Sequence, residues 1–151
     1  MIQESLPTRW HMACATILLN QTRRTPDWDR TLYDLFGTFP SPSSLAQAGP
    51  ELEELLRPHG FQNVKANRLR RFCSEWLEWD GTDLEALCSI GNYAVDSDWI
   101  FYFGERPHPD WVWDKELVAF LEREAAECAP VSTRGARAAP PIVHGHQASL
   151  K

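Results

Sequence analysis

The sequence lacks the features that mark metal-dependent, secreted and membrane proteins. Its four cysteines are separated by 59, 15 and 40 positions, so no Cys-x-x-Cys pair is available for zinc or an iron–sulfur cluster. No apolar run reaches the roughly 18 residues of a membrane span, and no charged leader precedes the longest run as in a signal peptide. We therefore expect no metal centre, no membrane partner, and four reduced, mostly buried thiols.

Basic residues are also outnumbered, because 15 Lys and Arg stand against 21 Asp and Glu, for a net charge of −6. This balance argues mildly against a nucleic-acid partner, which usually attracts a basic surface. The basic residues are clustered, however: residues 57–71 contain five of them and no acid, and Arg23 and Arg24 form a second pair. The run is either a phosphate-binding surface or a solvated helix face, and charge alone does not separate the two.

Helical periodicity dominates what is present, while strand-like alternation is scarce. A chain of 151 residues normally forms one domain. We predict an all-α domain over residues 1–128 and a disordered tail over residues 129–151, where Pro, Gly, Ala, Ser and His dominate. The expected helices cover residues 10–19, 28–36, 92–103 and 113–124, one long segment after Gly60, and short segments after Ser44, Pro50 and Gly81.

The segment Leu87-Cys88-Ser89-Ile90-Gly91 lies between two helical patterns and predicts a tight hairpin that joins two helices. Gly91 permits close backbone approach and frees the first amides of the next helix, which can bind a phosphate. Asp114 follows 23 residues beyond Gly91. An acid at this distance could face the sugar of a nucleotide whose phosphate the hairpin holds.

The hairpin and its distant Asp resemble the helix-hairpin-helix DNA glycosylase superfamily, whose motif runs from such a hairpin to an essential Asp. Further motifs resemble one branch, the glycosylase domains of the methyl-CpG-binding-domain thymine glycosylases, over roughly residues 2–124. The resemblance implies a two-lobed, all-α helix-hairpin-helix fold. The motifs are Ile2-Gln3-Glu4-Ser5-Leu6, Trp10, Ala15-Thr16-Ile17, Leu19-Asn20, Thr22, Leu55-Leu56-Arg57-Pro58 with Gly60, Ile90-Gly91-x-Tyr93, Asp96-Ser97, Ile100-Phe101 and His108-Pro109.

Asp114 is the predicted catalytic residue. Breaking the bond between a base and deoxyribose builds positive charge on the sugar, which a carboxylate stabilises while it orients the attacking water. The resemblance assigns this role to Asp114, although an isolated Asp there would be only a favourable acid in the first turn of a helix. Asp110 is a rival, but after Pro109 it fits the helix N-cap better.

Tyr93 and Gln3 are the predicted base pocket. In superfamily members that also nick the strand, a Lys at the second position after the hairpin's last Gly forms a Schiff base with the sugar. Tyr93 occupies that position here, so water is the expected nucleophile. The resemblance places Gln3 in the pocket as well, where its amide offers a donor and an acceptor to the Watson–Crick edge of thymine or uracil.

Contacts with DNA are expected on either side of this pocket. Flipping a base costs a few kcal/mol, which filling the vacated stack can offset. The resemblance assigns that role to Gln21, where the family has Arg, and to Phe61, although Phe61 fits a buried hydrophobic staple equally well. Ser89 also departs from the family, which has Gly there. The predicted DNA hairpin comprises Leu87, Ser89, Ile90 and Gly91. Phosphate contacts are expected from Lys65, Arg68, Arg70 and Lys115, although Lys115 could instead be a solvated charge.

The sequence thus predicts a monofunctional glycosylase that removes thymine or uracil mispaired with guanine, leaving an abasic site. Its expected partner is double-stranded DNA with a mismatched base, and it is expected to act as a nuclear monomer. No cofactor is expected, although the hairpin carbonyls could hold a monovalent cation. Two alternatives stay open: an adenine glycosylase acting opposite damaged guanine, and a non-catalytic helix-hairpin-helix DNA-binding module.

Overall fold

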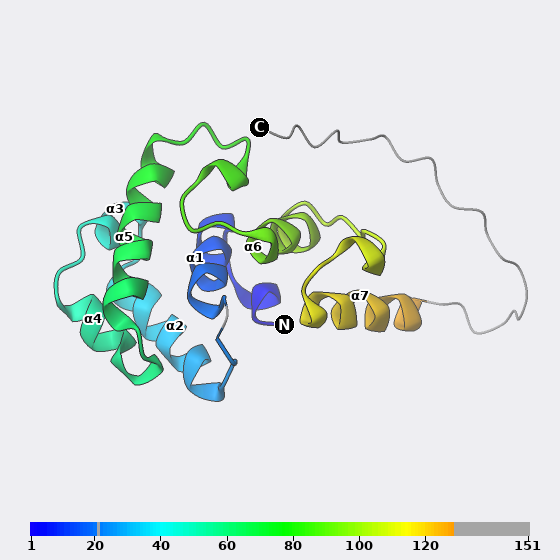
Figure 1. Cartoon of the computed structure of the whole chain (residues 1–151), viewed down its shortest axis with the longest axis horizontal. Helices are drawn as coiled ribbons and strands as arrows, with labels where there is room; N and C mark the ends of the chain where they lie inside the picture. Colours follow the sequence, from blue (N-terminus) through cyan, green and yellow to red (C-terminus); the bar gives the residue numbers. More distant parts are fainter. Residues whose placement is uncertain (21, 129–151) are drawn as a thin grey trace, which may run out of the picture.

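A computed structural model describes residues 1–20 and 22–128, and in this part of the chain it contains helices and no strand. The prediction of an all-α fold is confirmed. Gln21 and the predicted tail over residues 129–151 lie outside the described residues. The α-helices are α1 (Arg9–Leu19), α2 (Pro26–Thr38), α3 (Pro42–Ala46), α4 (Glu51–Leu56), α5 (Gln62–Glu78), α6 (Asn92–Ser97) and α7 (Lys115–Cys128) (Figure 1).

Helix α1 is the centre of the larger part of the molecule. Its residues 12–19 are all buried, and the hydroxyl of Thr16 is satisfied within the helix by donating to the carbonyl of Ala13 at 2.8 Å. Thr8 caps the helix by accepting the amide hydrogen of His11. Helices α2 to α5 lie on one side of α1 (Figure 1) and share with it one hydrophobic cluster, which includes Trp28, Leu35 and Phe72.

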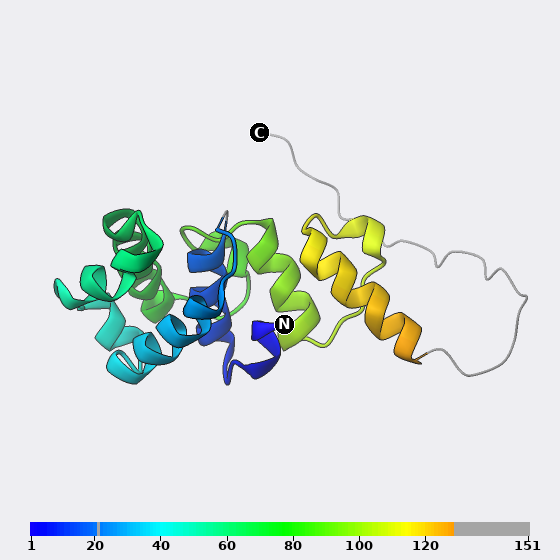
Figure 2. The ribbon, with the colours of Figure 1, turned by 90° about the horizontal axis from the view of Figure 1, so that it is seen from below.

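A second, smaller hydrophobic cluster lies on the other side of α1, around α7. It consists of Ile100, Val112, Leu117, Phe120 and Leu121, with Tyr93 and Phe101 partly buried against it. Figure 2 shows α1 and α6 between the two groups of helices. The division of the core into two clusters leaves room for a site between them.

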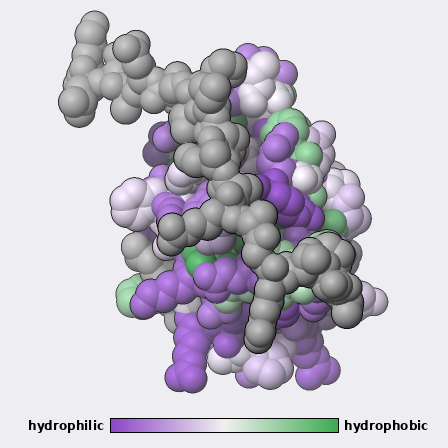
Figure 3. All heavy atoms as spheres, turned by 90° about the vertical axis from the view of Figure 1, so that its right-hand side faces the viewer, coloured by the Kyte–Doolittle hydropathy of each residue, from purple (hydrophilic) through white to green (hydrophobic). Residues whose placement is uncertain are grey.

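The surface at the α7 end is predominantly hydrophilic where its atoms are visible, with single apolar residues between polar ones (Figure 3). No helix within residues 1–20 and 22–128 combines the length and the hydrophobicity needed to cross a bilayer.

Arg9 and Asp98 link the start of α1 to the segment after α6. The guanidinium of Arg9 donates to both carboxylate oxygens of Asp98, at 2.8 and 2.6 Å, and to the carbonyl of Gly81 at 2.9 Å. Both charged side chains are nearly buried, and paired groups with satisfied hydrogen bonds are what such burial requires. The guanidinium also lies about 5 Å from three aromatic rings, those of Trp79 (4.8 Å), Tyr102 (4.9 Å) and Phe103 (5.1 Å).

The predicted helix over residues 92–103 is divided in two. Helix α6 ends at Ser97, and a π-helical turn, Asp98–Tyr102, continues it. The amide of Phe103 bonds to the carbonyl of Asp98 at 3.1 Å, five residues back, so the turn is wider than an α-turn. The wide turn begins at Asp98, whose side chain is directed inward to Arg9.

The prediction that Asp110 caps the last helix is wrong. Asp110 lies in a separate 3-10 turn, Pro109–Trp111, and Val112 after it is extended. A hydrogen bond from the Val112 amide to the Pro109 carbonyl closes this turn, and the extended backbone of Val112 separates it from α7. Helix α7 begins only at Lys115, and Asp114 is the residue that caps it.

Candidate active site

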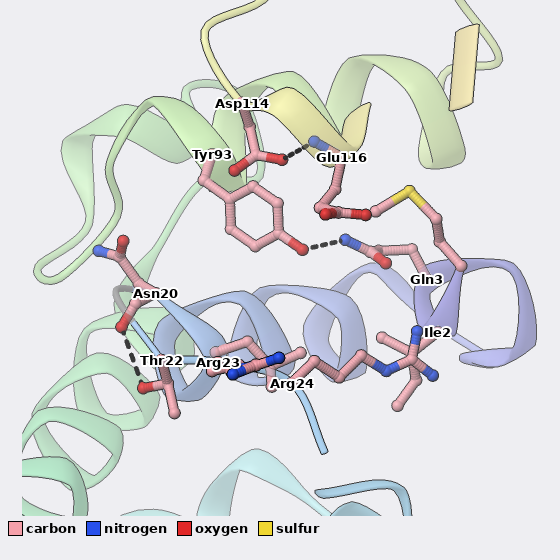
Figure 4. A pocket seen from close by; sticks show the side chains of 11 residues that line it. Ile2, Gln3, Asn20, Thr22, Arg23, Arg24, Tyr93, Asp114 and Glu116 are labelled. Carbon is pink, nitrogen blue, oxygen red and sulfur yellow. Dashed lines mark hydrogen bonds between the residues drawn. The ribbon is translucent and has the colours of Figure 1, made fainter. Parts of the chain in front are cut away.

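A cavity of about 440 Å³ lies where the start of the chain, the end of α1, helix α6 and the first turn of α7 meet (Figure 4). Three residues predicted from the sequence as site residues, Gln3, Tyr93 and Asp114, line it together. Its lining residues are Met1, Ile2, Gln3, Leu19, Asn20, Thr22, Arg23, Arg24, Tyr93, Asp114 and Glu116.

Gln3 is held in the short 3-10 helix Ile2–Ser5 and is only 4% exposed. Its amide nitrogen donates to the hydroxyl of Tyr93 at 2.6 Å and lies 3.4 Å from the hydroxyl of Ser97. Its amide oxygen is buried and has no hydrogen-bond partner within the described residues. An unpartnered buried acceptor costs about 1–3 kcal/mol in a folded protein, so its presence beside a cavity calls for a functional explanation.

Tyr93 points from α6 toward Gln3 (Figure 4). Burial, and to a lesser extent the negative charge of Asp114, raise the pKa of the Tyr93 hydroxyl, although the bond from Gln3 opposes the shift. The hydroxyl therefore keeps its proton at neutral pH. Since its oxygen already accepts from Gln3, the O–H of Tyr93 is available to donate into the cavity.

Asp114 caps α7 and lines the cavity with the same side chain. One carboxylate oxygen accepts from the amides of Glu116 and Leu117, at 2.9 and 3.2 Å. The other has no hydrogen-bond partner within the described part of the chain. The two amides fix the side chain in one orientation, and its catalytic role stays a prediction.

A second carboxyl group supports the backbone next to Asp114. Asp96 of α6 is half-buried, and one of its oxygens lies 3.4 Å from the amide nitrogen of Trp113. Burial, and then the charge of Asp114, raise the pKa of Asp96, while the bond from Trp113 opposes the shift. This contact links the segment before α7 to α6, the helix that follows the hairpin.

Several charged or polar residues of the cavity were not predicted as site residues. Glu116 contributes a second carboxylate from α7, and Asn20 lies at the end of α1. Arg23 and Arg24 had been noted as a basic pair without a role, and both line the cavity. Arg24 is also paired with Asp29 at 3.0 Å. Only the proximity of Glu116 to Asp114 in the sequence could have indicated its place.

The hairpin contains a backbone conformation that is energetically unfavourable for the residue that adopts it. Ser89 has a φ of 63°, in the left-handed region, where a residue with a Cβ atom is disfavoured by about 1–2 kcal/mol. This is the position at which the resembled family has Gly. Gly91, in contrast, is extended, and a Cβ atom there would meet nothing within 4 Å. The amides of Gly91 and Asn92 have no hydrogen-bond partner within the described residues.

Arg68 is the predicted phosphate contact that lies beside the hairpin. It is exposed on α5 and, with Ile17, Asn20 and hairpin residues 89–91, surrounds a depression of about 310 Å³. Among the described residues, no carboxylate pairs with it. Lys115 is exposed at the start of α7, next to Asp114.

The structure contradicts the predicted phosphate contacts of Lys65 and Arg70, because protein groups hold both cations. Lys65 is only 7% exposed, and its ammonium group donates to the carbonyl of His59 at 3.1 Å. The guanidinium of Arg70 donates to both carboxylate oxygens of Glu53, at 2.6 and 2.7 Å, and to two backbone carbonyls. The basic run over residues 57–71 is therefore mostly a set of intramolecular contacts.

Phe61 is 81% exposed and precedes α5 in a left-handed conformation, with a φ of 50°. The alternative that Phe61 is a buried staple is therefore wrong, since its ring does not pack into either hydrophobic cluster. The stack-filling role of Phe61 stays a prediction, as does that of Gln21, which lies outside the described residues.

No family model matches the sequence. The methyl-CpG-binding domain protein 4-like protein of Arabidopsis thaliana is 27% identical over 107 residues, which are 70% of this chain. The chain spans about 22% of the length of that relative.

Proposed function

We propose that this protein is a monofunctional DNA glycosylase that hydrolyses the N-glycosidic bond of thymine or uracil mispaired with guanine. The carrying observation is the arrangement around the cavity, where a Tyr hydroxyl and an unpartnered Gln carbonyl lie near a fixed carboxylate. The cavity of about 440 Å³ is also within the usual size of small-molecule pockets. The partial similarity to a methyl-CpG-binding domain protein 4-like protein supports DNA as the partner.

The pocket has the hydrogen-bonding pattern that a flipped thymine or uracil needs. The carbonyl oxygen of Gln3 would accept the N3–H of the base, and the hydroxyl of Tyr93 would donate to a neighbouring carbonyl. Binding the base would thereby satisfy the buried acceptor of Gln3. Adenine also presents a donor next to an acceptor, so it is the appropriate competing substrate in a test.

The chemical step would use the free carboxylate oxygen of Asp114. As the bond to the base lengthens, positive charge develops on the deoxyribose, and a carboxylate beside it lowers the energy of that state. Water would attack the sugar carbon, because Tyr93 has no amine with which to form a Schiff base. The products would be the free base and an abasic site in an intact strand.

The proposed partner is double-stranded DNA. Arg68 and the free amides of Gly91 and Asn92 would contact phosphates of double-stranded DNA. The hairpin carbonyls offer oxygen ligands suited to a hard cation, but neither the base contacts nor the hydrolysis above depends on one. Action as a monomer in the nucleus belongs to the same proposal.

The function is tested with matched duplexes that carry single T·G, U·G or A·8-oxoguanine pairs, followed by alkali to cleave abasic sites. We expect alkali-dependent breaks at T and U, and none at A. Breaks only in the A·8-oxoguanine duplex would identify an adenine glycosylase. Binding to mispairs without any break would identify a non-catalytic DNA-binding module.

The absence of an amine at position 93 leads to a separate prediction. With Tyr93 in place of Lys, borohydride should trap no covalent adduct between protein and DNA while excision proceeds. The measurement is a denaturing gel of the reduced reaction mixture. A Tyr93→Lys variant serves as the matched comparison, and an adduct formed by the parent protein would reveal an amine nucleophile elsewhere.

The position of Arg68 predicts a salt effect. Replacing Arg68 with Ala should weaken binding to all duplexes alike and lower the salt slope of binding by about one unit, because one phosphate contact no longer releases a counterion. Fluorescence anisotropy at several salt concentrations measures the slope. Arg123→Ala, which removes an exposed Arg from α7, is the control and should leave the slope unchanged. Equal slopes for both variants would place the DNA on another surface.

A further inference from the structure

The turn before α5 presents a bare aromatic ring on a tightly held backbone. Gly60 and Phe61 both have left-handed conformations, with φ values of 71° and 50°. For Phe61 this conformation is costly, because its Cβ atom crowds the backbone. The ring of Phe61 nevertheless lies 81% exposed, so its own packing does not hold the turn in place.

Phe61 immediately precedes α5, the helix that carries Arg68 beside the hairpin. Positions four apart share one face of a helix, so Val64 and Arg68 lie on the same face of α5, and Phe61 stands at the N-terminal end of that helix. All three are exposed, and Arg68 borders the depression at hairpin residues 89–91. Arg68 and Phe61 are seven positions apart, about 10 Å along the helix axis, so a duplex that contacts Arg68 and the hairpin is long enough to reach the Phe61 turn.

Contacts among four residues, Trp28, Thr31, His59 and Lys65, attach the turn to helices α2 and α5. The imidazole of His59 stacks on the buried ring of Trp28, with centroids 3.7 Å apart and planes inclined by 19°. The same imidazole also shares a hydrogen bond with the hydroxyl of Thr31, which lies 2.6 Å from Nε2. Lys65 donates to the His59 carbonyl at 3.1 Å, and its ammonium group lies 5.0 Å from the centre of the Trp28 ring.

Burying the ammonium group of Lys65 costs free energy, and its hydrogen bond to the His59 carbonyl in the turn offsets part of that cost. An ammonium group loses hydration on burial, and this burial lowers the pKa of Lys65. Burial, and then the charge of Lys65, also lower the pKa of His59, although Asp27 opposes the shift, so the imidazole is neutral at neutral pH. A neutral ring both stacks on Trp28 and shares one hydrogen bond with Thr31.

We propose that Trp28, Thr31, His59 and Lys65 form a positioning cluster that holds the Phe61 turn rigid, so that the Phe61 ring enters the base stack when a nucleotide is flipped out. The proposal rests on the proposed function. Its physical basis is that a fixed wedge needs no ordering at the moment of insertion, whereas a loose turn would first have to be ordered. The four residues act through Phe61 and do not themselves contact DNA.

The test compares variants that loosen the turn with a matched variant that does not. Thr31→Val removes the hydroxyl partner of His59 at nearly constant shape, and Lys65→Met removes the ammonium group but keeps an apolar stem. Thr38→Val makes the same change as Thr31→Val at an exposed position of the same helix α2. Phe61→Ala removes the wedge itself. Thermal melting followed by circular dichroism checks that each variant is folded.

Two readouts separate positioning from general damage. The first is the fluorescence of 2-aminopurine placed beside a T·G pair, which rises on unstacking and is measured in an Asp114→Asn background, where excision is strongly slowed. We expect Phe61→Ala to abolish the rise, and Thr31→Val and Lys65→Met to reduce it about three- to tenfold, since small misplacements have large effects in such steps. The second readout is excision from single-stranded DNA, which needs no stack to be filled and should be unchanged.

The outcomes distinguish this inference from the proposed function. A Thr31→Val response equal to that of Thr38→Val would overturn the positioning cluster, as would no fluorescence rise with the parent protein. Equal losses on duplex and single-stranded DNA would also overturn it, because they would indicate damage to the pocket. A fluorescence rise that falls in Thr31→Val but not in Thr38→Val, together with no excision by the protein that retains Asp114, would support the positioning cluster and refute the glycosylase activity alone.

Discussion

Replacing Asp114 with Asn is expected to lower the rate of base excision on the order of 10²–10³-fold, the usual cost of removing an electrostatic group that stabilises a transition state. Asn keeps the shape of the side chain, and its carbonyl oxygen can still accept from the amides of Glu116 and Leu117 that Asp114 now binds. The fold and mispair binding should therefore survive. Only the negative charge that we propose to face the sugar is lost. Single-turnover excision and a binding titration measure the two effects separately.

The control for this prediction is Asp110→Asn. Asp110 lies four residues earlier in the separate 3-10 turn, and its side chain is 84% exposed. Its replacement should leave excision within about twofold of the parent rate, since an exposed charge outside the site contributes little. If Asp110→Asn is the inactive variant, or if Asp114→Asn excises at the parent rate, the assignment of the catalytic carboxylate is wrong.

Replacing Asp98 with Ala is expected to lower the free energy of unfolding by about 3–5 kcal/mol, which is typical when one partner of a buried ion pair is removed. Asp98 is 3% exposed, and it accepts two hydrogen bonds from Arg9, itself only 11% exposed at the side chain. Without Asp98 the guanidinium would remain enclosed by three aromatic rings with one carbonyl partner. Urea denaturation followed by tryptophan fluorescence measures the loss.

Asp29→Ala provides the comparison, because Asp29 forms the same type of pair with Arg24 at the surface. The two side chains of that pair are 51% and 47% exposed. Exposed pairs contribute about 0–1 kcal/mol, so this variant should unfold at nearly the parent urea concentration. A similar loss of stability in both variants would mean that burial does not decide the value of the Arg9–Asp98 pair.

Several features of this protein depend on local sequence and were accessible without a structure. The apolar spacing predicted helices at the positions of α1, α2, α5 and α7, because a helix repeats every 3.6 residues and must bury one face. The hairpin and the start of the last helix near Asp114 could also be predicted, since a turn and a helix start each depend on a few neighbouring residues. The spacing between the hairpin and Asp114, together with the family resemblance, predicted Asp114 as the catalytic residue.

Local reasoning failed where a side chain had a choice of partners. Lys65 and Arg70 belong to a basic run that predicted phosphate contacts, yet one is buried against Trp28 and the other pairs with Glu53. Nothing in the order of the residues indicates that these partners lie close. A cation takes the best-placed acceptor available to it, and helix packing decides which acceptor that is.

The site itself shows the same division between local and tertiary information. The sequence by itself, through the family resemblance, predicted Gln3, Tyr93 and Asp114 as residues of one site. Only the tertiary structure decided that Gln3 donates to Tyr93 across 90 positions of chain, that it lines a cavity, and that its own buried oxygen remains unpartnered. The physical reason is that hydrogen-bond donors and acceptors are satisfied in space, so a group left unsatisfied becomes visible only when every neighbour has been placed.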